Sequence, residues 1–462
     1  MTLIKSISGI RGTIGGKVGQ GLSPLDVVKF AAAYGTWIMD RNNGSKVKIV
    51  LGRDARISGL MVEGLVVSTL QALGIDVLNL GFSTTPTVEL AVPLEGAHGG
   101  IILTASHNPK QWNALKLLNE KGEFISGAEG EKLLKIADDE AFDFADVDNL
   151  GSIATDDSYM DKHIEHVLQL KGVEPELIAQ ANFKVACDCV NSTGGIVIPK
   201  LLKALGVKEV IEMYCEPNGQ FPHNPEPLAE NLTAISDKIK SEGADLGVVV
   251  DPDVDRLAMV NEDGSMFGEE YTLVAVADHV LSYEIGCAVS NLSSTRALRD
   301  VCTRHGQSYY ASSVGEVNVV DMMKKQNAVI GGEGNGGIIY PESHYGRDAL
   351  VGIGLFLTLL AKKKMTMTEL KASYPIYFMS KNKIQLTPDI DVDAILSEMA
   401  HKYSNEDVST IDGVKIDFKN EWVHLRKSNT EPIIRVYSES NSQENADAIA
   451  KRIMDEILLI TA

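Results

Sequence analysis

The chain has 462 residues, of which 44% are apolar and 23% are charged, enough for about three or four domains with ordinary hydrophobic cores. Its formal net charge of -20 repels nucleic acid and anionic membrane surfaces, so we expect neither as a partner. No segment approaches the roughly 20 apolar residues of a membrane span, and the first residues lack the apolar stretch of a secretory signal. We therefore expect a cytoplasmic protein, either a monomer or a homodimer.

Helical and strand patterns alternate along most of the chain, which is typical of an α/β protein with parallel or mixed sheets. A first helix begins at Ser23-Pro24, because Ser is a good cap and Pro suits the first helical position. The strand 47–52, the helix 57–74 and the strand 75–81 follow, and each ends at a glycine.

Three later strands each run into a glycine-rich or acidic loop, at 183–195, 244–256 and 327–337. A helix around 196–205 follows the first of them. This repeated strand-to-loop unit predicts repeated α/β domains.

The five cysteines are odd in number and match no zinc-binding template; they are Cys187, Cys189, Cys215, Cys287 and Cys302. Cys187 and Cys189 lie two residues apart in a predicted strand, so both face the same side. This spacing favours buried thiols over a disulfide.

The residues from 371 onward follow a different pattern. Candidate helices cover 391–402 and 442–459, and candidate strands cover 376–385, 413–418, 422–426 and 432–438. This pattern predicts a small α+β domain with a mixed or antiparallel sheet. We therefore expect an α/β fold of three similar domains with mixed sheets, followed by a smaller α+β domain, with all four around a central cleft. The predicted domains are 1–150, 151–255, 256–370 and 371–462.

The first candidate loop is TASHNP, residues 104–109, directly after the apolar strand 99–103. Ser106 thus lies at the carboxyl end of a strand, where open α/β sheets place their sites. Its hydroxyl suits a nucleophile or a phosphate carrier, with His107 and Lys116 near enough in sequence to move protons. A capped turn is the alternative, because Ser, Asn and Pro are common turn formers.

The second loop, DPDVDR, carries Asp251, Asp253 and Asp255. An EF-hand is disfavoured, because Arg256 stands where that motif needs Gly and an apolar strand precedes the loop. Three carboxylates in a compact loop favour a hard cation such as Mg2+, with a phosphate oxygen completing its shell. A solvated acidic turn is the alternative, but a strand that delivers the loop to a sheet edge argues against it.

The third loop, GGEGNGG, spans residues 331–337. Its glycines allow close approach of backbone to a ligand, and Glu333 and Asn335 suit vicinal sugar hydroxyls. It is not a Walker loop, because no Gly-Lys-Ser/Thr follows. A plain flexible turn is the alternative.

The fourth loop, RKSNTEPIIR, forms a local positive cluster in an acidic chain. The guanidiniums of Arg426 and Arg435 suit bidentate phosphate binding. The residues between them, Ser428, Asn429 and Thr430, add polar groups, and their amides suit an anion-binding nest. An exposed turn with surface arginines is the alternative.

Together the four loops resemble those of the α-D-phosphohexomutase family of phosphoglucomutases, phosphomannomutases and phosphoglucosamine mutases. In order, they resemble the family's phosphoserine, metal, sugar and phosphate loops, one in each predicted domain. The resemblance covers essentially the whole chain, since four further stretches also match: SGIRG (8–12), GRDARISG (52–59), NPEPLAENL (224–232) and VGE (314–316).

The resemblance implies an enzyme, an intramolecular phosphotransferase in which Ser106 carries a phosphate. The phosphoserine donates to a hexose monophosphate, and the resulting bisphosphate returns its other phosphate to Ser106. A sugar 1,6-bisphosphate is the implied activator. One Mg2+ would be bound by the phosphate on Ser106 together with Asp251, Asp253 and Asp255.

The resemblance also implies roles for the remaining positions. Arg11, Lys116 and Arg256 match positions at the reacting centre, with Lys116 the expected proton-transfer partner. Glu333 would hold sugar hydroxyls. The distal phosphate would be held by Arg426, Ser428, Asn429, Thr430 and Arg435, on a C-terminal domain that closes as a lid.

Two departures from the family pattern bear on the sugar. Many relatives have Ser-Gly-His in the sugar loop where this chain has Asn335, Gly336 and Gly337, and His344 nearby is a candidate replacement. In the phosphate loop, Lys427 and Asn429 replace Pro and Gly; Asn tolerates the left-handed conformation that Gly favours. The GEGNGG form resembles a subgroup often assigned as phosphoglucosamine mutase, so we expect glucosamine phosphate ahead of mannose or glucose phosphate.

Two other classes remain as alternatives. A metal-dependent phosphatase with a serine nucleophile would not need the distal phosphate loop, which therefore favours the mutase. A non-catalytic sugar-phosphate sensor would be expected to lose the nucleophile or a metal carboxylate, and this chain keeps Ser106 and all three aspartates.

Overall fold

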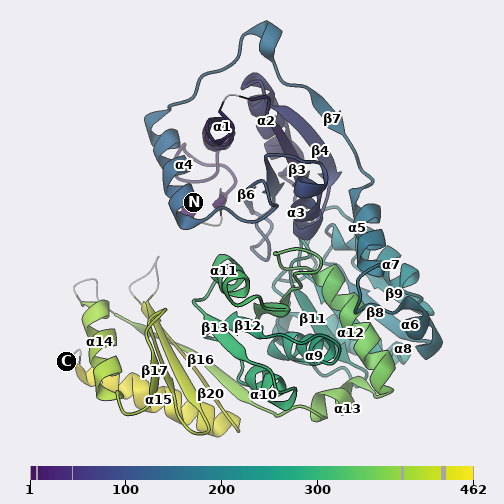
Figure 1. The fold of residues 1–462 in the computed structure, drawn as a ribbon, viewed down its shortest axis with the longest axis vertical. Helices are drawn as coiled ribbons and strands as arrows, with labels where there is room; N and C mark the ends of the chain where they lie inside the picture. The colour runs from purple at the N-terminus through teal and green to yellow at the C-terminus, as the bar shows by residue number, and fades with distance from the viewer. Residues whose placement is uncertain (1, 7–8, 44, 387–389, 428–432, 461–462) are drawn as a thin grey trace.

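The computed structural model describes residues 2–6, 9–43, 45–386, 390–427 and 433–460. They form four β-sheets, of seven, four, four and five strands (Figure 1). The first three sheets mix parallel and antiparallel strands, and the fourth is wholly antiparallel. The predicted fold class, three α/β domains and a smaller α+β domain, is confirmed.

The first sheet has the strand order β1-β2-β6-β5-β3-β4-β7. Its strands are β1 (Leu3–Ser6), β2 (Gly9–Thr13), β3 (Lys48–Arg53), β4 (Asp76–Phe82), β5 (Gly99–Leu103), β6 (Trp112–Leu118) and β7 (Ile153–Thr155). Its helical segments are α1 (Pro24–Arg41), α2 (Gly59–Ala72), α3 (Thr85–Leu94), α4 (Gly127–Asp139) and the 3-10 turn η1 (Val147–Asn149). The helix α1 begins where predicted, because Ser23 and Asp26 form a capping box at its first turn.

The second sheet has the order β11-β10-β8-β9 and the third has β13-β12-β14-β15. The strands of the second are β8 (Lys184–Asp188), β9 (Glu209–Met213), β10 (Leu246–Val250) and β11 (Leu257–Asn261), and those of the third are β12 (Ala288–Asn291), β13 (Tyr309–Ser312), β14 (Ile330–Glu333) and β15 (Gly337–Ile339). The accompanying helical segments are α5 (Tyr159–Leu168), α6 (Pro175–Ala181), α7 (Gly194–Ala204), η2 (Ala229–Asn231), α8 (Thr233–Glu242), α9 (Glu269–Leu281), α10 (Ala297–Arg304), α11 (Glu316–Gln326), α12 (Ala349–Lys363) and α13 (Met367–Ala372).

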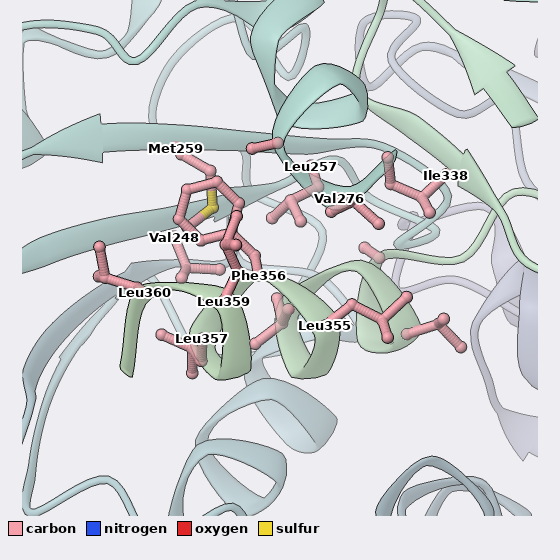
Figure 2. Packing of buried hydrophobic residues seen from close by; sticks show 14 of the residues in the cluster. Val248, Leu257, Met259, Val276, Ile338, Leu355, Phe356, Leu357, Leu359 and Leu360 are labelled. Atoms are coloured by element: carbon pink, nitrogen blue, oxygen red, sulfur yellow. The ribbon is translucent and has the colours of Figure 1, made fainter. Parts of the chain in front are cut away.

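The helix α12 joins the second and third sheets into one core. It is apolar on every side, and residues 349–361 are all buried, as expected for a helix enclosed by protein. Figure 2 shows Phe356 of α12 beside Val248 and Met259 of the second sheet, with Ile338 of the third sheet beyond them. A single hydrophobic cluster therefore runs through both domains.

The first and second sheets each include a strand beyond the domain boundary that the sequence suggests. The strand β7 pairs with β4, so the first sheet continues past residue 150. The strand β11 returns antiparallel to β10, so the second sheet continues past residue 255. The physical reason is the same in both cases: backbone pairing with a strand distant in sequence decides which sheet a short segment joins.

The fourth sheet has the order β16-β20-β19-β18-β17, with two helices on one face. Its elements are β16 (Phe378–Gln385), α14 (Val392–Lys402), β17 (Asp407–Ser409), β18 (Val414–Asp417), β19 (Trp422–Lys427), β20 (Ile433–Ser440) and α15 (Gln443–Ile460). The other face contacts the third domain, where Ser293 Oγ lies 2.9 Å from His424 Nδ1. Among the described residues, no helix has both the length and the apolar character to cross a bilayer.

Candidate active site

Each of the four candidate loops connects two antiparallel neighbours of its own sheet. The first loop joins β5 to β6, the second β10 to β11, the third β14 to β15, and the fourth β19 to β20. In the first three sheets the loop follows a strand that is parallel to its other neighbour. The loops therefore occupy the same position in three similar units, at the carboxyl ends of strands.

The backbone of Ser106 is held in a strained conformation. Its φ is +47°, which a non-glycine residue rarely adopts. The Ser106 amide donates to Thr104 Oγ1 at 2.9 Å, and that hydroxyl donates to Asp54 Oδ2 at 2.7 Å. The strain is maintained by buried hydrogen bonds that point the Ser106 side chain out of the loop.

Arg56 is a structural support of this loop whose role the sequence did not reveal. It is 1% exposed and donates to four loop carbonyls, those of Ser106, Asn108, Pro109 and Trp112. Its Nε also pairs with Asp54 Oδ2 at 3.0 Å. The motif GRDARISG supplies both partners, so its charged residues hold the serine loop in shape.

The serine loop and the acidic loop meet directly. Ser106 Oγ donates to Asp251 Oδ2 at 2.7 Å, although the two residues come from different sheets. The other oxygen of Asp251 accepts from the amides of Asp255 and Arg256, both at 3.2 Å. Val254 has a φ of +64°, an outlier for a β-branched residue, so this loop is also tightly constrained.

The acidic loop has the chemistry of a hard-cation site. Asp251, Asp253 and Asp255 are completely buried, and they offer oxygens that lie within 4.8 Å of one another. Within the described part of the chain, Asp253 Oδ1 and Asp255 Oδ1 have no hydrogen-bond partner. Burial raises the pKa of Asp251 well above its usual range, and the other two carboxylates raise it further. A bound divalent cation would satisfy the unpaired oxygens and offset this repulsion.

Lys116 on β6 neutralises part of the acidic loop from the first domain. Its Nζ lies 2.7 Å from Asp253 Oδ2 and 3.1 Å from Asp255 Oδ2. Burial opposes the charge on Lys116, but the two carboxylates more than offset it and raise its pKa above the ordinary lysine value. Lys116 is therefore an ammonium here, and its charge is held beside the acidic loop.

His107 and two arginines surround Ser106. His107 Nδ1 lies 3.4 Å from Ser106 Oγ; burial, reinforced by the charge of Arg256, lowers the pKa of His107 to about 3, so the ring is neutral. A cavity of about 50 Å3 beside the serine is lined by Arg11, His107 and Lys116. Arg256 reaches Glu226 of the NPEP stretch at 3.4 Å.

The glutamate of the sugar loop is held by a residue that the sequence analysis missed. Arg347 lies 3.2 Å from Glu333 Oε2, 3.0 Å from Glu316 Oε2 and 2.8 Å from Asp255 Oδ2. It thereby ties the sugar loop to the acidic loop. A Cβ at Gly337 would lie 2.3 Å from Arg347 Cδ, so a histidine there would displace Arg347.

The other residues of the third loop are engaged locally. Asn335 Oδ1 accepts from the amide of Gly337 at 3.1 Å, which closes a turn. His344 lies between Asp348 Oδ2, at 3.1 Å, and Glu89 Oε2, at 3.4 Å. Of these two contacts, the one to Asp348 is a hydrogen bond, whereas within the described residues His344 Nδ1 and the Glu89 carboxyl group have no hydrogen-bond partner.

Glu270 packs against Gly334 of the third loop, and its raised pKa predicts a pH-dependent stability. A Cβ at Gly334 would lie 2.0 Å from Glu270 Oε1, so any other residue there would displace this carboxyl group. Burial, with Glu269 adding to it, raises the pKa of Glu270 from 4.5 to about 8. Between these values the folded state keeps a proton that the unfolded state loses, so this contribution to the free energy of unfolding falls as pH rises.

Glu270→Gln should remove this dependence of the free energy of unfolding on pH, because glutamine does not titrate. Its side-chain oxygen can still accept the hydrogen bond that the Thr295 amide donates to Glu270 at 2.9 Å. Urea unfolding of both proteins across this pH window measures the effect. Glu284→Gln, at an exposed ion pair with Lys171, is the matched control. Identical slopes for wild type and Glu270→Gln would contradict a protonated Glu270.

The two arginines of the fourth loop face the same side of their sheet. Arg426 and Arg435 are cross-strand partners, and Lys383 of β16 pairs with Arg435, so three cations lie in one row. Arg426 Nε lies 2.9 Å from Asp412 Oδ2, which accepts from the Val314 amide at 2.8 Å. Ser428, Asn429 and Thr430 lie outside the described residues.

Comparison with known proteins identifies the family. The models for phosphoglucomutase/phosphomannomutase alpha/beta/alpha domains I, II and III match residues 3–144, 161–264 and 269–377, and the model for the C-terminal domain matches residues 382–456. The chain is 33% identical over 440 residues to a phosphoglucomutase/phosphomannomutase of Thermococcus kodakarensis, covering 94% of this chain and 95% of that protein. It is 30% identical over 455 residues to a phosphoglucosamine/phosphogalactosamine mutase of Sulfurisphaera tokodaii, covering 96% and 97%.

A solved structure is also similar over nearly the whole length. The crystal structure of a phosphoglucomutase/phosphomannomutase family protein from Burkholderia thailandensis matches with a TM-score of 0.84 and 26% identity, covering 98% of both chains. These matches confirm the resemblance inferred from the four loops. The chain belongs to the phosphoglucomutase/phosphomannomutase family, whose members are phosphosugar mutases and therefore isomerases.

Proposed function

We propose that this chain interconverts glucosamine 6-phosphate and glucosamine 1-phosphate through a phosphoserine at Ser106 and a bisphosphate intermediate. The observation that carries the proposal is the 2.7 Å hydrogen bond from Ser106 Oγ to Asp251 Oδ2. It brings a strained, reactive serine against three buried carboxylates. A phosphoryl group on that serine would lie beside a metal site, as phosphoryl transfer requires.

The choice of sugar rests on two supports. A relative that matches 96% of this chain is named a phosphoglucosamine/phosphogalactosamine mutase, and several others at about 30% identity have phosphoglucosamine mutase in their names. The sugar loop has Gly337 where many family members have histidine, and Arg347 fills the space. Phosphomannomutase/phosphoglucomutase activity is the second candidate, because the Thermococcus kodakarensis relative is named for it.

The chemistry is two reversible phosphoryl transfers. A hydroxyl of the sugar monophosphate attacks the phosphorus of phosphorylated Ser106; one P–O bond forms as the bond to Ser106 Oγ breaks. The hydroxyl loses its proton and Ser106 Oγ gains one. The bisphosphate then reorients in the site, so that its other phosphoryl group is transferred to Ser106 Oγ by the same exchange. We assign proton transfer at the reacting oxygens to Lys116, which bridges the serine loop's domain to the acidic loop, with His107, 3.4 Å from Ser106 Oγ, as a second participant.

The binding roles are assigned by matching the charge and hydrogen-bonding groups of each side chain to a part of the substrate. We assign Arg11 and Arg256 to the transferring phosphoryl group and Glu333 and Asn335 to the sugar hydroxyls. The distal phosphate is assigned to Arg426, Ser428, Asn429, Thr430 and Arg435. Arg426 and Arg435 support this assignment, because they face one side of the sheet together.

One Mg2+ is proposed at Asp251, Asp253, Asp255 and the phosphate on Ser106. When bound, it would neutralise charge on the transferring group. Exhaustive chelation should therefore lower turnover by about three orders of magnitude, since such an ion contributes several kcal/mol to the barrier. Activity assayed with EDTA, and then with excess Mg2+, tests this. A chelator presaturated with Mg2+ is the control, and full activity without divalent ions would contradict the metal site.

A coupled assay tests the function as a whole. Purified protein, Mg2+ and a trace of the matching sugar 1,6-bisphosphate, the proposed activator, would be given glucosamine 6-phosphate, mannose 1-phosphate or glucose 1-phosphate, and kcat/KM compared. A preference for the amino sugar supports the proposal, and turnover of only the neutral sugars would overturn the substrate. Release of inorganic phosphate without isomerisation would instead indicate a phosphatase.

A further inference from the structure

A second group of potential metal-ligating side chains lies in the second domain. Among the described residues, the acidic loop and a set of three cysteines are the two groups whose ligand atoms converge. The sulfur atoms of Cys187, Cys189 and Cys215 all lie within 4.8 Å of one another. The sequence places the first two on one strand face, but nothing in its spacing connects them to Cys215.

Parallel pairing of β8 and β9 brings the third cysteine into place. Cys187 is the partner of Glu212, and the Cys189 amide donates to the Met213 carbonyl at 3.2 Å. Cys215 follows β9 by two residues, so it reaches the same end of the sheet as Cys189. Three thiols thus meet where the two strands end.

The geometry suits one soft cation. A zinc–sulfur bond of about 2.3 Å puts the sulfurs of a common ion roughly 4 Å apart, which agrees with the observed limit. Cys187 and Cys189 are completely buried, whereas Cys215 is half-buried and gives access from solvent.

We propose that Cys187, Cys189 and Cys215 bind one thiophilic d10 cation, Zn2+, at a site separate from the carboxylates of the acidic loop. Three sulfur–metal bonds form as the thiols release their protons to solvent, and no oxidation occurs. A fourth ligand enters from the solvent side, at Cys215. The two sites divide by chemistry, because thiolates select soft ions and carboxylates select hard ones.

The thiol site is connected to the active site through a short segment. Cys189 precedes Ser192 by three residues, and Ser192 Oγ donates to the Pro252 carbonyl at 2.6 Å. Thr193 Oγ1 donates to the same carbonyl at 3.0 Å. Pro252 stands between two proposed ligands of the acidic loop, so an ion at the thiols would steady the segment that holds that loop.

Cadmium titration of the full-length, reduced, metal-free protein tests the proposal. Cd2+ replaces Zn2+ and shows thiolate-to-metal charge-transfer absorption, which carboxylates do not; excess Mg2+ keeps the acidic loop occupied. We expect one Cd2+ per chain. Cys215→Ser should lose part of the band and weaken binding by more than the roughly 10–100-fold typical of losing an outer partner. Zn2+ should displace the Cd2+ and raise the melting temperature of wild type more than that of this variant.

Cys287→Ser is the matched control, because this buried thiol lies outside the cluster and donates to the Gln326 carbonyl at 3.5 Å. It should bind Cd2+ like wild type. Far-UV circular dichroism checks that both variants fold. Absence of the band in wild type, an unchanged band in Cys215→Ser, or a disulfide among the three cysteines in place of metal binding would each overturn the proposal.

Discussion

Ser106→Ala is expected to abolish isomerisation while leaving the fold intact. Loss of a serine nucleophile costs roughly 10^6-fold in turnover in well-studied cases. The fold should persist, because the loop is held by backbone and Arg56 contacts that do not involve Ser106 Oγ. The measurement is the coupled assay on wild type and variant, with circular dichroism to compare their folds.

A second readout separates a catalytic role from a structural one. Incubation with the sugar bisphosphate should add one phosphate to wild type, detected by intact mass, and none to Ser106→Ala. Ser152→Ala is the control, since Ser152 is exposed and its hydroxyl donates to the half-buried Asp76 at 2.6 Å. Near-normal turnover in a folded Ser106→Ala protein would remove Ser106 from the mechanism.

Arg347→Met should produce the largest loss of stability among single substitutions at the site. Arg347 is the shared partner of Asp255 and Glu333, which are buried, and of Glu316, whose side chain is 9% exposed. Removing one member of a buried ion network costs about 3–5 kcal/mol, because the remaining charges are left without compensation. The free energy of unfolding from urea titration at neutral pH measures this cost.

The same variant should also turn over about 100-fold more slowly, because Arg347 aligns the sugar loop with the acidic loop. Its destabilisation should shrink at acid pH, where the orphaned carboxylates take up protons. Arg299→Met is the matched control: its partner is Asp417 at 3.7 Å, its side chain is 43% exposed, and it should lose less than about 1 kcal/mol. A loss at Arg347 no larger than at Arg299 would contradict the network.

Much of the architecture could be predicted from local patterns. The helix at Ser23, the strands that deliver the loops and both C-terminal helices lie close to their predicted places. These predictions rest on caps, periodicity and glycine positions, which act within a few residues of the chain. Short strands such as β7 and β17 were missed, because three residues carry too little pattern to identify a strand.

The chemical groups available to the site could be identified from local sequence: a serine after a strand, three aspartates at alternate positions, a glycine-rich loop and two arginines near the end. Which of these groups meet depends on how the four sheets assemble. Arg347 and Cys215 are single residues with no local pattern, and the stretch that contains Arg56 does not reveal what Arg56 contacts. Each of the three gains its role from partners far away in the chain. Their positions depend on strand pairing and on burial of charge, which are properties of the assembled sheets rather than of any short segment.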